Sequence, residues 1–122
     1  MAGTLPIVKV QAPGAGGEDN EADVMLWSDQ AGQARNEDSP DARYREAEAE
    51  SHLGNYYSNQ GNYCEALKHD QAALNAYDRI PEGDPHRQEY DQQFGVTTEK
   101  KFLQDSKDKT DDGSKCEPAL VS

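Results

Sequence analysis

Two helical apolar patterns, separated by only two breaking residues, constrain this chain more than any other feature. In residues 42–59 the apolar positions recur at spacings of four, three and one: Ala49, Leu53, Tyr56 and Tyr57. In residues 63–77 they again fall at helical spacing: Tyr63, Ala66, Leu67, Ala73, Leu74 and Tyr77. Gly61-Asn62 lies between the two patterns. Amphipathic helices joined by so short a break are expected to fold back as an antiparallel pair.

The first of these helices also has a distinct polar face. Its side chains are mostly small and hydrogen-bonding, rather than only charged: Glu48, Ser51, Asn55, Ser58 and Asn59. Asp41, which follows Pro40, is placed to cap the start of the helix. The pattern predicts a helix with one face in the core and one face free to contact a partner.

An internal repeat extends the helical prediction in both directions. Shifting the sequence by 41 residues aligns residues 26–54 with residues 67–95 and gives seven identities, among them Gly54 with Gly95. About two would be expected from average composition. The repeat predicts an earlier helix over residues 21–36 and a later one over residues 84–103. The expected fold is all-α, with four helices that form one full repeat and two partial ones.

The residues of the full unit resemble the tetratricopeptide repeat. Leu53-Gly54-x-x-Tyr57, Gly61-x-Tyr63, Ala66 and Ala73 match that signature in order and spacing. The chain departs from it at Glu50, Asp70 and Asp78, and the closing proline is delayed to Pro81. The standard unit has about 34 residues, so the longer period here is similar to the variant in kinesin light chains and Pins-type modulators.

The resemblance implies a function as well as a fold. It implies a concave groove, lined by first helices, that receives a peptide or a helix from a partner protein. The polar face would line it: Glu48, Ser51, Asn55, Ser58 and Asn59. Repeat packing would rest on Leu53, Gly54, Tyr57, Gly61, Tyr63, Ala66 and Ala73. A clamp for a terminal carboxylate is not expected, because Ser51 stands where chaperone-binding members carry lysine.

Charge narrows the class of partner. The chain has 122 residues with 24 acidic and 12 basic side chains, a formal net charge of -12. Such a chain repels phosphate backbones and anionic membranes, so we expect no nucleic acid or membrane partner and favour a basic peptide or protein surface. Since about three repeats are needed for independent stability, self-association is a further expectation.

Both ends of the chain are expected to be disordered. Residues 1–20 are rich in proline, glycine and acids, and residues 105–122 form an acidic and polar tail, so residues 21–104 are the expected folded region. The sequence shows neither a signal peptide nor a membrane span, which predicts a cytoplasmic protein. Cys64 and Cys116 are too few for a disulfide framework and are expected to be reduced.

No catalytic, cofactor or metal site is expected. Glu46, Glu48 and Glu50 are predicted to form a solvated helix face, and Asp70 to lie at an exposed groove edge. The three histidines and Cys64 are not at metal-ligand spacing: His52, His69 and His86.

The sequence therefore predicts a non-enzymatic protein-interaction module, an adaptor or scaffold of the tetratricopeptide type. Two alternatives stay open. One is an acidic, largely disordered protein that binds a basic partner. The other is a truncated product of a larger tetratricopeptide protein. A circular dichroism spectrum with a melt would separate the folded reading from the disordered one.

Overall fold

The computed structural model describes residues 20–116, and within that range the chain is entirely helical with no strand. The elements are α1 (Glu21–Arg35), α2 (Pro40–Asn59), α3 (Tyr63–Asp78), α4 (Pro85–Gln93), α5 (Val96–Lys109) and a short 3-10 helix, η1 (Ser114–Cys116). The predicted all-α class is confirmed. Residues 1–19 and 117–122, which hold most of the expected arm and the end of the expected tail, lie outside the described residues.

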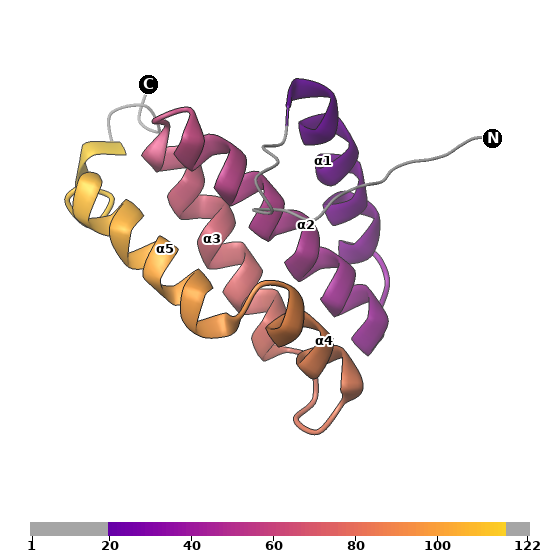
Figure 1. Cartoon of the computed structure of the whole chain (residues 1–122). Helices are drawn as coiled ribbons and strands as arrows, with labels where there is room; N and C mark the ends of the chain where they lie inside the picture. Colours follow the sequence, from indigo (N-terminus) through magenta and orange to yellow (C-terminus); the bar gives the residue numbers. More distant parts are fainter. Residues whose placement is uncertain (1–19, 117–122) are drawn as a thin grey trace.

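The helices are arranged around a central pair (Figure 1). α2 and α3 lie in the middle, α1 covers one side of α2, α5 covers the far side of α3, and α4 crosses one end. Contacts between side chains show that α1 and α2, α2 and α3, and α3 and α5 each run antiparallel. For α2 and α3, Glu46 pairs with Arg79 while Gly54 packs on Asp70.

Local capping explains where the first three helices begin. Asn20 and Asp23 form a reciprocal capping box on α1. α2 starts at Pro40, whose missing N–H costs nothing at that position, and the Ser39 side chain accepts a hydrogen bond from the Ala42 N–H at 3.0 Å. Ser39 is therefore the cap that was expected of Asp41. Asn62 caps α3 in the same way.

The expected helix over residues 84–103 is wrong, because the chain breaks there into α4 and α5. Gly95 lies at the break with φ +83, a left-handed conformation that favours glycine. Gly54, its partner in the 41-residue alignment, lies inside a continuous helix. The two aligned glycines thus have different structural roles, and the described chain has five α-helices rather than four.

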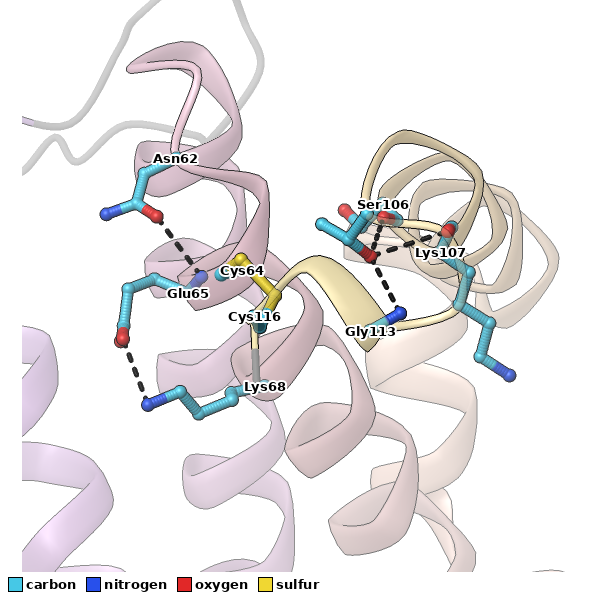
Figure 2. The surroundings of a disulfide bond; sticks show 9 residues. Asn62, Cys64, Glu65, Lys68, Ser106, Lys107, Gly113 and Cys116 are labelled. Carbon is cyan, nitrogen blue, oxygen red and sulfur yellow. Dashed lines mark hydrogen bonds and ion pairs between the residues drawn. A yellow bond between two sulfur atoms is a disulfide. The ribbon is translucent and has the colours of Figure 1, made fainter. Parts of the chain in front are cut away.

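The expected tail also begins later than residue 105. α5 runs on to Lys109, and η1 follows after a turn in which Asp111, Asp112 and Gly113 all have positive φ. Cys116, in η1, forms a disulfide with Cys64 in the first turn of α3 (Figure 2). The expectation of two reduced thiols is wrong, since sequence spacing alone could not show that these cysteines meet.

The core is small and lies where α2, α3 and α4 meet. Its buried cluster comprises Tyr44, Ala47, Ala76, Tyr77, Ile80 and Tyr90, with Phe94 and Val96 packed against it. Away from that cluster, Met25 and Leu26 on α1 are 71% and 66% exposed. Of the helices in residues 20–116, none is both long enough and apolar enough to cross a membrane.

Candidate functional site

The first half of the predicted binding face is occupied by other parts of the chain. Glu48 accepts a hydrogen bond from Gln30 Nε2 of α1 at 3.0 Å, and burial raises the pKa of this carboxyl. Ser51 is buried, and its hydroxyl lies 2.6 Å from the hydroxyl of Tyr90 on α4. Ser51 is therefore not available at the surface, and Glu48 is held by α1.

The second half of that face is open. Asn55 and Ser58 are partly exposed and Asn59 is exposed. Within residues 20–116 the side chains of all three make no hydrogen bond, ion pair or ring contact. At helical spacing these positions, i, i+3 and i+4, share one side of α2. The structure therefore leaves three adjacent hydrogen-bonding side chains on one surface.

His52 lies at the boundary between the two halves. Its ring is buried and stacks on Trp27 of α1, with centroids 3.8 Å apart and planes inclined by 6°. Phe94, just after α4, meets the same ring edge-on at 5.5 Å. α1 and α4 thus both reach α2 at His52, and beyond it towards the C-terminus the polar side chains of this face make no polar contact with the described helices.

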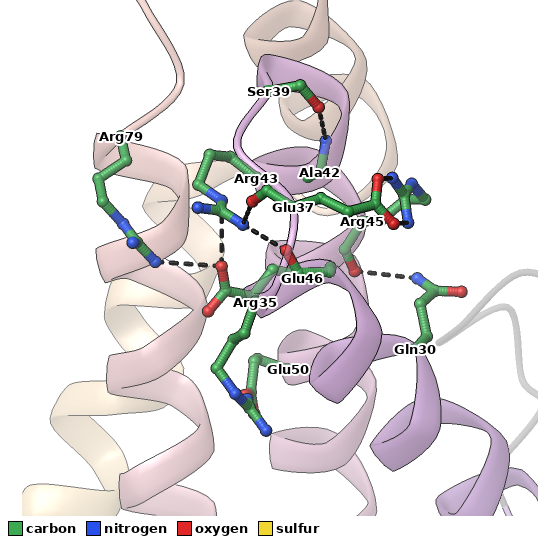
Figure 3. Close-up of polar contacts among 11 residues, drawn as sticks. Gln30, Arg35, Glu37, Ser39, Ala42, Arg43, Arg45, Glu46, Glu50 and Arg79 are labelled. Atoms are coloured by element: carbon green, nitrogen blue, oxygen red, sulfur yellow. Dashed lines mark hydrogen bonds and ion pairs between the residues drawn. The ribbon is translucent and has the colours of Figure 1, made fainter.

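The expected solvated face of glutamates is wrong for Glu46 and Glu50, which are buried and ion-paired (Figure 3). Glu46 lies 3.2 Å from Arg43 Nε and 3.0 Å from Arg79 Nη2 of α3. Glu50 pairs with Arg35 of α1 at 3.1 Å and with His69 of α3 at 2.6 Å. Buried charges need such partners. These carboxylates join three helices and are not free to act on a substrate.

Arg43 also fastens the end of α1 to α2. Its guanidinium donates to the carbonyl oxygen of Ala34 and, at 2.7 Å, to that of Glu37. The last carbonyls of a helix have no partners within the helix, so a side-chain donor there satisfies them. Arg43 is itself buried, and its ion pair with Glu46 neutralises the charge that this position places in the core.

Asp70 is buried rather than exposed, so the expectation of an exposed groove edge is wrong. It is 2% exposed and packs directly on Gly54, where an added Cβ would lie 2.1 Å from Asp70 Oδ1. Its carboxyl interacts with that of Glu99 on α5, which is 3% exposed. Burial raises the pKa of both carboxyls, and the interaction with Asp70 raises that of Glu99 further.

The sequence reasoning missed Glu99, although a signal for it exists. Glu99, Leu103 and Ser106 are the buried residues of α5 and fall at i, i+4 and i+7, so the carboxyl lies on the helix's inner stripe. The error over Asp70 has a simple cause: its partner comes from α5, a helix that the 41-residue repeat did not predict as a separate element.

The residues predicted to pack the repeat are found at the junction of α2 and α3. Leu53, Ala66 and Ala73 are buried there. Tyr57 is partly exposed and stacks on His69 at 5.4 Å. Two more lie at the start of α3: Gly61 occupies the preceding turn with φ +78, and the ring of Tyr63 lies 4.7 Å from Lys109 Nζ.

The three histidines lie in separate surroundings: His52 between rings, His69 on Glu50, and His86 on Asp84 at 2.7 Å. Among residues 20–116 no group of three or more His, Cys, Asp or Glu side chains is arranged to hold a metal ion. Comparisons with protein-family models, curated proteins and solved structures find no match for this chain.

Proposed function

We propose that this chain is a non-enzymatic protein-binding module, an adaptor or scaffold that receives a peptide or helix of a partner on the C-terminal half of α2. The site consists of Asn55, Ser58 and Asn59, which we call the open face. The resemblance to the tetratricopeptide repeat suggested that this helix carries the binding surface. The open face narrows the proposal to the part of it that α1 and α4 leave uncovered.

One observation supports the proposal above the others. The open face carries three polar side chains without partners in the described chain, beside a half of the same helix in which Glu48 and Ser51 are used internally. Side-chain amides carry both donors and an acceptor, and hydroxyls do both, so this set can bind the backbone of an extended peptide. Burial of such groups is tolerated only when they are hydrogen-bonded.

Charge suggests the chemistry of the partner. With 24 acidic against 12 basic side chains, the chain attracts a basic segment over several ångströms. Electrostatic complementarity mainly speeds association and selects partners, while the local amides fix register. We therefore propose a basic peptide as the ligand class, with binding that weakens as salt rises.

A displayed peptide library selected on the full chain tests the proposal. We expect enriched peptides to carry lysine or arginine, to bind the wild-type chain, and to lose at least tenfold in affinity for Asn55→Arg. Arginine there adds bulk and a positive charge that repels a basic ligand.

Asn75→Arg is the matched control, since Asn75 is an exposed asparagine on the outer side of α3. It should bind the same peptides with wild-type affinity and give the same helical circular dichroism as Asn55→Arg. Equal binding by all three proteins, or no enrichment over an empty selection, would refute the open face as the site.

The second candidate function, an acidic and largely disordered binder, makes a different prediction for the same protein. The five α-helices within residues 20–116 favour the folded module over it. A cooperative thermal loss of helical circular dichroism is expected for the folded module, and a weak spectrum without a transition for the alternative. Self-association stays a prediction, which sedimentation of the wild-type chain would test.

A further inference from the structure

We propose that Asp70 and Glu99 form a proton-operated latch that holds the start of α5 on α3 and releases it as the pH rises. The latch is a property of the fold and does not depend on the proposed peptide site. Its two carboxyls come from two different helices, Asp70 from α3 and Glu99 from α5, so their contact is a contact between helices.

The burial of the pair favours a proton on one of the two carboxyls. Asp70 and Glu99 are 2% and 3% exposed and interact directly, and two neighbouring carboxylates shielded from water repel each other unless one of them is protonated. Glu99 Oε2 is buried and has no hydrogen-bond partner in the described chain. An ionised Glu99 would leave a negative oxygen buried without a donor or a counter-ion.

The groups around the pair offer little compensation for a second negative charge. Towards Glu99 the neighbours are Asp70 and the Ser51 hydroxyl of α2. Towards Asp70 they are Glu99, the Ser106 hydroxyl of α5 at 3.5 Å, and His69, whose Nδ1 already lies on Glu50. The phenol of Tyr90 on α4 is close to both carboxyls, and its pKa is raised by burial first and by the two carboxyls in addition.

No lysine or arginine within residues 20–116 forms an ion pair with Asp70 or Glu99. The arginines of the core serve Glu46 and Glu50 instead. Once the proton is lost, the repulsion between the two carboxylates can therefore be relieved only by their separation.

α5 has little else to hold it. Leu103 is its one buried large apolar side chain, with Val96 half-buried at the start of the helix, while Phe102 is 48% exposed. At the far end the disulfide between Cys64 and Cys116 fixes the chain beyond α5 to α3. Release should therefore be confined to the end of α5 that carries Glu99.

Amide hydrogen exchange of the full, oxidised chain, followed by NMR at pH 6, 7 and 8, tests the latch. Each measured exchange rate is divided by the intrinsic rate at that pH to give the equilibrium constant for local opening. If opening releases one proton, this constant rises tenfold per pH unit. We expect protection at residues 98–103 to fall about tenfold per unit, with a smaller fall near residue 110. Amides of α2 and α3 should change far less.

Glu99→Gln keeps a donor for Asp70 without a titratable group, so its α5 protection should be nearly independent of pH. Glu89→Gln, at an exposed position on α4, is the matched control and should behave as wild type. A pH-independent wild type, the same fall in Glu99→Gln, or an equal fall throughout α2 and α3 would overturn the latch.

A second measurement needs no variant. Carboxyl carbon titration of the wild-type chain should show the Glu99 carboxyl still protonated at neutral pH. An ordinary glutamate titration at that carbon would contradict the proposal even if Glu99→Gln failed to fold.

Discussion

The two halves of α2 have similar polar sequences and opposite roles. In the first half, Glu46 and Glu50 are buried and form ion pairs with arginine or histidine, and the Ser51 hydroxyl is hydrogen-bonded to that of Tyr90. In the second half, the open face of Asn55, Ser58 and Asn59 has no partner within the described chain. Polar residues on one helix are thus structural where other helices cover them and available for binding where they do not.

Predictions follow from this difference, and the largest effect is expected in the covered half. Glu46→Ala should lower the free energy of unfolding by about 3 kcal/mol, because it leaves the buried Arg43 without its counter-ion. Urea denaturation measures the change. Glu89→Ala, an exposed control, should change stability by less than about 0.5 kcal/mol. Equal effects of the two would show that Glu46 is solvated.

Gly54 lies between the halves and should tolerate no side chain. Gly54→Ala places a Cβ 2.1 Å from Asp70 Oδ1, so we expect a loss of about 2 kcal/mol by overpacking. Gly32→Ala is the control within another helix, where the nearest atom to the new Cβ is 3.9 Å away. It should be neutral or stabilise by about 0.5 kcal/mol. If both substitutions left the free energy of unfolding unchanged or raised it, α2 and α3 would not be in close contact at Gly54.

The pH dependence of the free energy of unfolding should come mainly from the carboxyl of Glu99, which lies beside Ser51. Burial and Asp70 raise the pKa of Glu99 to about 10, so the folded chain keeps a proton that the unfolded chain loses. This group therefore favours folding most below the ordinary glutamate pKa, and its contribution falls as pH rises toward about 10, by about 1.4 kcal/mol per unit. Glu99→Gln should remove this slope in urea titrations at pH 6, 7 and 8. An unchanged slope would place the proton elsewhere.

The open face should contribute least to stability. Asn55→Arg should shift the free energy of unfolding by less than about 0.5 kcal/mol, because it removes no hydrogen bond within the described chain. Thermal and urea denaturation measure this. A loss near that of Glu46→Ala would mean that Asn55 is structural, and the contrast between the halves would fail.

The parts of the fold and of the candidate site that could be predicted from the sequence are those that depend on local interactions. The α2 and α3 helices follow from apolar spacing, and their breaks at Gly61 and Pro81 from backbone conformation, so both were predicted nearly in full. The partners of Glu46 and Asp70 could not be predicted, because Arg79 and Glu99 lie on other helices. The disulfide was missed for the same reason, since Cys64 and Cys116 are 52 residues apart.

The split at Gly95 shows a different limit. The 41-residue alignment paired Gly95 with Gly54 and so predicted a helix through both. Gly54 is required by a close approach to Asp70, whereas Gly95 is required by a positive φ. Glycine is required at the two positions for different structural reasons, and an alignment of identical residues cannot tell these reasons apart. For the open face, sequence predicted Asn55, Ser58 and Asn59 from helical spacing alone, but could not show which half α1 and α4 would cover.

Chemical-shift mapping of a selected basic peptide on the isotopically labelled chain tests the binding proposal most directly. We predict that the largest amide and side-chain shifts lie at residues 55–59 and that residues 43–51 change little. Shifts concentrated on the outer side of α3, or spread evenly over the acidic surface without saturation, would contradict it.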